Sequence, residues 1–204
     1  MIEQIFYSNF AFILRGLKHA VFDVFRKPRP QNNVFRNIFK GQSANLLANG
    51  KSINNHSFLP TKNVLITNHF WRHPHYSNIC SGFHFVSDKR FCEASDIGFF
   101  VQNRNPNLIF VTTTEIFSCI RKLGFDGVCM EVNYSGSKPG WNEKNRLVSD
   151  FSEVLQTGGT VVADFCLPFV SFTGADELNI YGLDLDYGPN GDCLLYTSPS
   201  PRDA

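Results

Sequence analysis

Three short polar segments of the chain contain residues of the kinds that bind nucleotides or metal ions. They are "NGKS" (49–52), "TNHFWRHPHY" (67–76) and "GLDLDYG" (182–188). Each segment follows or ends a short apolar run, which is typical of a buried strand. In proteins built from parallel strands and covering helices, ligands bind at the carboxyl ends of the strands. These segments therefore supply the candidate site residues.

The first segment contains Gly-Lys-Ser, the closing triplet of a phosphate-binding P-loop. A P-loop also needs a glycine five residues before Gly50, and Asn45 stands there instead. The segment is better interpreted as a turn in which Gly50 bends the chain and exposes backbone N–H groups. Asn49 is expected to cap this bend, and Ser52 to cap the following helix. Such a turn can hold a phosphate; the alternative is a turn with only a structural role.

The second segment is rich in histidine, the side chain that most often binds metals. However, no cysteine or carboxylate is spaced with His69, His73 and His75 as a fourth ligand. Pro74 also disfavours the helix that would bring His69 and His73 onto one face. We therefore predict no metal site here, and expect histidines that are solvated or packed on aromatic rings.

Amide and carboxylate side chains stand where three expected strands end. Asn68 ends the run 63–68, and Asp88 ends the run 82–88. Both are candidate nucleotide-binding residues, although Asp88 could equally be a helix N-cap. Asp184 and Asp186 form an Asp-x-Asp pair, which can bind Mg²⁺ or Mn²⁺ through hard oxygen ligands. The alternative for this pair is solvation without a metal.

Apolar runs and helix-like segments alternate from residue 43 onward. The expected strands cover 43–48, 63–68, 82–88, 108–112, 127–132 and the beginning of 177–188. The expected helices cover 113–123, 142–156 and 160–172, with a kink at Pro168. Because the strands lack strict polar alternation, they favour a sheet buried on both faces. The predicted fold is α/β and Rossmann-like, with a mostly parallel sheet covered by helices.

The two ends of the chain differ from this central pattern. Residues 1–40 are predicted to form an amphipathic helix and a linker, with seven Lys or Arg against two acidic residues. This region could contact an anionic membrane surface; the alternative is packing against the domain. Residues 41–192 are expected to be an incomplete nucleotide-binding domain. Residues 193–204 resemble a translated sequencing adapter, so we expect a C-terminal truncation.

Composition narrows the classes of partner. The chain has 204 residues and a formal net charge of +1, so no strong positive field favours a nucleic-acid partner. No run of about 20 apolar residues predicts a membrane-spanning helix. The six cysteines include no C-x-x-C pair, which is typical of reduced cysteines in the cytoplasm. The expected location is cytoplasmic, with membrane association through 1–40 as a further expectation.

The order of these segments resembles a known family. A strand leading into "NGKS", a strand leading into "TNHFWRHP", "FHFVSD", and finally "GTVVADFCLPFVSFTGADELNIYGLDLDYG" are similar to N-G-P-S-L, N-x-F, a helix and G-x-K-E-I-Y-L-x-G-x-D. That is the pattern of bacterial sialyltransferases of glycosyltransferase family 42. A related domain occurs in 6-hydroxymethylpterin diphosphokinase-like and surface-polysaccharide proteins. The resemblance covers about residues 43–188.

The resemblance implies a nucleotide site and a reaction. It places near the nucleotide the matching residues Asn49, Ser52, Asn68, the region of Thr160, Asp184 and Tyr187; Gly50 belongs to the same turn. It implies transfer of a sugar from a nucleotide-sugar donor, such as CMP-sialic acid, to a surface glycan without an essential metal. The alternatives are a pyrophosphate-transferring enzyme, with Mg²⁺ at Asp184 and Asp186, or a non-catalytic nucleotide-binding module.

Two departures from the family pattern affect these expectations. Lys51 replaces the usual proline of the first turn. The family's general-base histidine lies beyond the aspartate that matches Asp184, and no histidine of this chain occupies that place. The catalytic residue is therefore unassigned, and we expect the chain as given to be inactive in sugar transfer.

Overall fold

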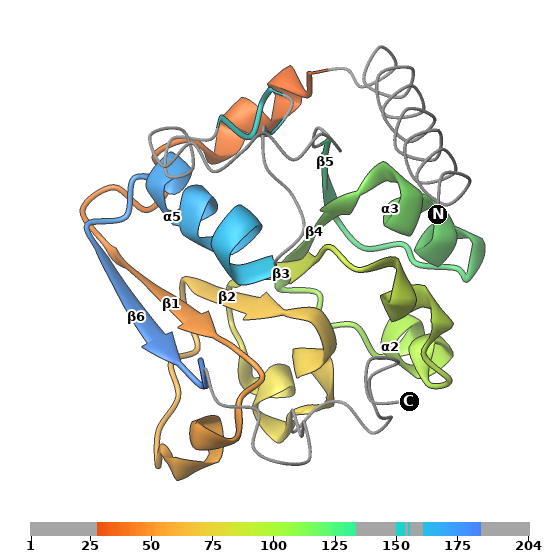
Figure 1. The fold of residues 1–204 in the computed structure, drawn as a ribbon, viewed down its shortest axis with the longest axis horizontal. Coiled ribbons are helices and arrows are strands. Elements are labelled where there is room, and N and C mark those ends of the chain that lie inside the picture. Colours follow the sequence, from red (N-terminus) through yellow and green to blue (C-terminus); the bar gives the residue numbers. More distant parts are fainter. Residues whose placement is uncertain (1–27, 134–149, 154, 156–160, 185–204) are drawn as a thin grey trace, which may run out of the picture.

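The computed structural model describes residues 28–133, 150–153, 155 and 161–184. Six parallel strands form one sheet in the order β5-β4-β3-β2-β1-β6 (Figure 1). Their bounds are β1 Ser43–Leu47, β2 Val64–Thr67, β3 Gly82–Val86, β4 Leu108–Thr113, β5 Cys129–Val132 and β6 Glu177–Tyr181. The predicted α/β, Rossmann-like class is confirmed, and all the described strands are parallel.

Helices follow the strands and cover both faces of the sheet (Figure 1). The α-helices are α2 Ile97–Gln102, α3 Thr114–Lys122 and α5 Leu167–Thr173. Short 3₁₀ helices are η1 Pro30–Phe35, η2 Lys51–Asn55, η3 Asn68–Arg72, η4 Pro74–Asn78 and η5 Lys89–Glu93. A π-helical segment, η6 Val161–Cys166, runs directly into α5. The change of helix type falls one residue before Pro168, where we predicted a kink, because proline lacks the N–H that continues a helix.

The sheet separates two apolar cores. One core packs Leu47, Ile66 and Phe110 against η3, η5, α2 and α3. The other packs Leu46, Leu65 and Val111 against η6 and α5. Consecutive residues of one strand thus enter opposite cores, so no position of β2 is exposed. This burial on both faces explains why the strand runs lack polar alternation.

The expected helix 142–156 is wrong in its described part. Residues 150–153 form a turn, in which Asp150 Oδ1 accepts hydrogen bonds from the backbone N–H and the hydroxyl of Ser152, at 2.9 and 2.6 Å. Leu155 N–H donates to Asn133 O at 2.8 Å, beside the end of β5. An aspartate that bonds its own backbone two residues on competes with a helix. Residues 142–149 lie outside the described residues.

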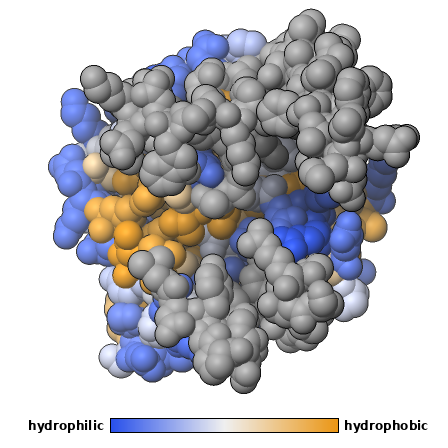
Figure 2. Space-filling model, viewed as in Figure 1, coloured by the Kyte–Doolittle hydropathy of each residue, from blue (hydrophilic) through white to orange (hydrophobic). Residues whose placement is uncertain are grey.

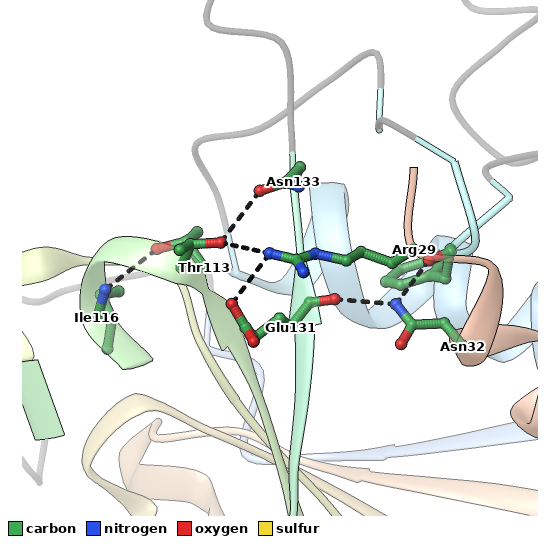
Figure 3. A network of polar contacts seen from close by, with 8 residues as sticks. Arg29, Asn32, Thr113, Ile116, Glu131 and Asn133 are labelled. Carbon is green, nitrogen blue, oxygen red and sulfur yellow. Dashed lines mark hydrogen bonds and ion pairs between the residues drawn. The ribbon is translucent and has the colours of Figure 1, made fainter. Parts of the chain in front are cut away.

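The described part of the N-terminal region, from residue 28, is fastened to the sheet (Figure 3). Arg29 Nη2 donates to Glu131 Oε2 and to Thr114 Oγ1, both at 3.1 Å. Asn32 is buried and its Nδ2 donates to the carbonyls of Glu131 and Phe151, at 2.9 and 2.8 Å. Residues 28–39 therefore pack on the α/β domain. The predicted amphipathic helix at 1–27 lies outside the described residues.

Apolar side chains are exposed at and just after β6. Ile180 of β6 and Leu183, which follows that strand, are exposed apolar residues. Figure 2 shows an apolar area on the side of the molecule where α5 and β6 lie in Figure 1. Each helix in the described part of the chain falls short of the length and hydropathy that a membrane span needs.

Candidate functional site

The sheet has one topological switch point, between β1 and β6. From β1 the chain adds β2, β3, β4 and β5 in one direction, and then returns to place β6 on the other side of β1. The loops that leave β1 and β6 consequently diverge at the carboxyl edge of the sheet, which is where ligands bind in open α/β sheets. The described parts of two predicted segments, 49–52 and 182–184, meet here.

Backbone pairing continues past the ends of these two strands. Ala48 N–H donates to Tyr181 O at 2.9 Å, and Gly50 N–H donates to Gly182 O at 2.7 Å. Gly50 leaves no room for a side chain, because a Cβ there would lie 2.5 Å from Gly182 O and from Asp184 Cγ. Gly182 has φ +65° and would place a Cβ 2.8 Å from Ile53 Cβ. Glycine at both positions therefore permits the two loops to touch.

The Asp184 carboxylate binds the start of η2. Its Oδ2 accepts from Ser52 N–H at 2.9 Å, and its Oδ1 accepts a short hydrogen bond from the Ser52 hydroxyl. These bonds, and a weaker one from the Lys51 backbone, hold the pKa of Asp184 below its usual range. The expectation that Ser52 caps the following helix is wrong. Gly50 is the N-cap, which has no side chain to offer, and the Asp184 carboxylate satisfies the Ser52 N–H from the other strand.

Asn68 occupies an unusual backbone conformation at the end of β2. Its φ is +43°, a region that asparagine tolerates better than most residues. Its carbonyl oxygen accepts a 2.6 Å hydrogen bond from His84 Nε2, and His84 itself is buried inside β3. Its side-chain Oδ1 is buried and has no hydrogen-bond partner in the structure. A buried acceptor without a partner costs roughly 1–3 kcal/mol, so the half-buried side chain of Asn68 is a candidate ligand contact.

Two of the three histidines of this region pack against aromatic rings, as expected, and His75 bonds the Pro60 carbonyl instead. His69 stacks on Phe91 and His73 stacks on Phe70. Burial, with a smaller contribution from the Arg72 guanidinium, lowers the pKa of His69 to about 4. Burial likewise lowers the pKa of His84 to about 4. Among the described residues, no three His, Cys, Asp or Glu side chains are grouped as metal ligands.

Asp88 is found as a helix N-cap, one of the two alternatives. Its Oδ1 accepts from Arg90 N–H at 2.9 Å, and its Oδ2 accepts from Arg90 Nε at 2.7 Å. Although burial opposes the shift, these bonds with Arg90 lower the pKa of Asp88. Near Asp88, the Arg72 guanidinium donates two hydrogen bonds to the Asp96 carboxylate, at 2.8 and 2.6 Å. This ion pair fixes η3 to the start of α2.

The structure places the candidate residues along one edge. Asp184, Ser52 and Gly50 are in contact, and the buried Asn49 belongs to the same turn. Asn54 Oδ1 lies 3.1 Å from His73 Nε2, which links the loop after β1 to the loop after β2 that begins at Asn68. Asp88 lies one strand farther along. Thr160, Asp186 and Tyr187 are outside the described residues.

Sequence reasoning missed two residues that build this edge. Gly182 matters through its positive φ and its contact with the first turn. His84 matters through its bond to the Asn68 carbonyl. The available signal for His84 was a polar side chain within the apolar run "GFHFV", because a buried polar group needs a partner.

The comparisons with known proteins add no assignment. No protein-family model, curated protein or solved structure gave a significant match to the chain. The class of protein is therefore described from the fold and the site geometry alone. The protein has a Rossmann-like α/β domain with a polar switch-point edge.

Replacing Gly50 by alanine is expected to destabilise the domain by roughly 2 kcal/mol or more. The added methyl group would overlap Gly182 O and the Asp184 carboxylate, at 2.5 Å. Unfolding in urea, followed by circular dichroism, measures the change.

Gly98 in α2 provides the matched control, because a Cβ there would meet nothing within 4 Å. Gly98→Ala is expected to stabilise the domain by about 0.5 kcal/mol through improved helix propensity. Equal and small effects at the two glycines would contradict the close approach of the loops after β1 and β6.

The free energy of unfolding is expected to fall as the pH is lowered from about 6.5 toward 4. The pKa of His84 is about 4 in the folded state and about 6.5 when unfolded. Only the unfolded state gains a proton in this window. The contribution of His84 to the free energy of unfolding is therefore fully present above pH 6.5, and it decreases by up to about 1.4 kcal/mol per pH unit below it. Burial of His69 acts in the same direction.

Urea unfolding of the wild type and of His84→Gln between pH 4.5 and 8 measures this contribution. The variant should lose less stability on acidification, while the two profiles stay parallel between pH 7 and 8. Profiles that are parallel over the whole range would show that His84 titrates alike in both states.

Proposed function

We propose that the carboxyl edge around the β1/β6 switch point binds a nucleotide, and that the protein is a nucleotide-sugar-dependent glycosyltransferase. Asn49, Gly50, Ser52, Asn68 and Asp184 would hold the nucleotide. The observation that carries the proposal is the buried Asn68 Oδ1 without a hydrogen-bond partner. Asn68 follows β2 on the same edge of the sheet as the turn at residues 49–52, which the Asp184 carboxylate binds.

The charges at the edge indicate which part of a nucleotide each residue suits. Asp184 has a lowered pKa and is ionised at neutral pH, so it repels a phosphate placed directly against it. The carboxylate accepts two bonds from Ser52 and a weaker one from the Lys51 backbone, which leaves it capacity for one further hydrogen bond. Asp184 therefore suits a hydroxyl of a ribose. The Asn68 amide, which can both donate and accept, suits the edge of a base or a sugar hydroxyl.

Sugar transfer rather than nucleotide storage is supported by the sequence resemblance to family 42 sialyltransferases. The "NGKS", "TNHF" and "YGLD" segments lie at the ends of β1, β2 and β6, which are neighbours in the sheet in the order β2-β1-β6. The donor would be a nucleotide sugar of the CMP-sialic acid type, and the acceptor a hydroxyl of a surface glycan. The described residues include no assigned catalytic base, so binding is the property to test first.

Asn68→Gly is expected to weaken nucleotide binding by about tenfold or more, because it removes the amide while glycine accepts the φ of +43°. Loss of one such bond is worth about 1–3 kcal/mol, and 1.4 kcal/mol is tenfold in affinity. Calorimetric titration of both proteins with CMP, UMP, GDP and ATP, each with and without Mg²⁺, measures the change.

Asn63→Gly is the matched control. Asn63 also has a positive φ, +51°, but it precedes β2 at the opposite edge of the sheet. This variant should bind as the wild type does. Equal binding by Asn68→Gly and wild type would refute the proposed site, and a strict requirement for ATP with Mg²⁺ would favour pyrophosphate transfer over sugar transfer.

A further inference from the structure

Two cysteines far apart in the sequence meet beside the first core. Cys92 lies on η5, which follows β3, and Cys119 lies on α3, which follows β4. Cys92 Sγ points at α3, where it lies 4.0 Å from the carbonyl oxygen of Ile116, one turn before Cys119. The neighbouring Cys119 thiol is also one of the groups that raise the pKa of the Cys92 thiol, an effect that acts only at short range. The two sulfur atoms are therefore neighbours in the folded chain.

Both thiols are half-buried, so small reagents can reach them while the surrounding elements hold them together. The other described cysteines differ in setting. Cys80 is exposed, with its thiol directed at the Asn78 carbonyl. Cys166 is fully buried in the second core. Cys129 is partly buried on β5 and packs against the first core.

We infer that Cys92 and Cys119 form a redox-modification site that closes to a disulfide in the presence of hydrogen peroxide. The sulfur of Cys119 attacks a peroxide oxygen, the O–O bond breaks, and a sulfenic acid and water form. The sulfur of Cys92 then displaces the sulfenic hydroxyl, which leaves as a second water with the thiol proton. Two thiols are oxidised by two electrons, and hydrogen peroxide is reduced to two waters.

The surroundings assign the order of the two thiols. Burial, followed by the contact with Cys119, raises the pKa of Cys92 to about 12. Cys92 therefore stays protonated at neutral pH and is a poor first nucleophile, since the thiolate is the reactive form. It is suited to the second step, in which the sulfenic acid is already in contact with it.

The disulfide would join the loops that follow two neighbouring strands. Because η5 begins directly after its N-cap Asp88, oxidation would fix the Asp88 loop against α3. A cross-link between residues 92 and 119 also restricts the unfolded chain, so the oxidised protein should unfold at a higher temperature. This inference does not depend on the proposed nucleotide site.

Peptide mapping of the whole chain tests the inference. The reduced protein is treated with a small excess of hydrogen peroxide, remaining thiols are alkylated, and the digest is analysed by mass spectrometry. We expect a linked pair of peptides containing Cys92 and Cys119 in most molecules, two hydrogens lighter than the separate peptides and restored by dithiothreitol. Cys119→Ser should abolish the linked pair, and Cys80→Ser should leave it unchanged.

A second probe covers the case in which Cys119→Ser fails to fold. Phenylarsine oxide bridges two adjacent thiols, so the wild-type chain should bind it and lose alkylation at residues 92 and 119 together. Absence of the linked peptide in the wild type, or links to Cys80 in similar yield, would overturn the inference. Alkylation of both thiols at an unchanged rate in the presence of the arsenical would overturn it as well.

Discussion

The contact between the loops after β1 and β6 is the constraint on which the candidate site depends. Two strands on opposite sides of a topological switch point send their loops in different directions. Here the loops begin by touching, because Gly50 and Gly182 allow their backbones to approach and to share a hydrogen bond. The Asp184 carboxylate then closes the contact on Ser52. The shape of the edge follows from this arrangement.

A second interaction, between His84 of β3 and the Asn68 carbonyl at the end of β2, holds the next part of the edge in place. His84 lies inside β3, donates to the Asn68 carbonyl and is surrounded by aromatic rings, Tyr76, Phe91, Phe100 and Phe110. Burial keeps this imidazole neutral across the physiological pH range, and its Nε2 is the donor because the Asn68 carbonyl can only accept. The buried His84 thus helps to hold Asn68 in its left-handed backbone conformation.

The sequence predicted the sheet well because burial on both faces leaves a direct mark on composition. Apolar runs such as "VLIT" and "LIFV" are too short and too uniform for surface helices. The turn at Gly50 was also predictable, since glycine allows a tight bend. The helix expected at 142–156 failed at its end because Asp150 binds the Ser152 backbone, a local competition that apolar spacing does not report.

The site was predictable only as a set of strand ends. Ser52 and Asp184 are 132 positions apart. The sequence marked both as candidates, but it could not show that Asp184 accepts hydrogen bonds from Ser52. His84 was not among the candidates, and its contact with Asn68 depends on the register of β2 and β3. The types and the order of the residues limited the candidates. Which candidates meet depends on the topology of the sheet, which places β2 and β6 on either side of β1.

The most direct test of the account is to record amide NMR spectra of the ¹⁵N-labelled chain during titration with CMP. If the switch-point edge binds nucleotides, the largest shifts will fall on the backbone amides of Gly50, Ser52 and Gly182 and on the side-chain amide of Asn68. Shifts confined to the opposite edge of the sheet, around Asn63 and Gly82, or no saturable shifts with any nucleotide, would contradict it.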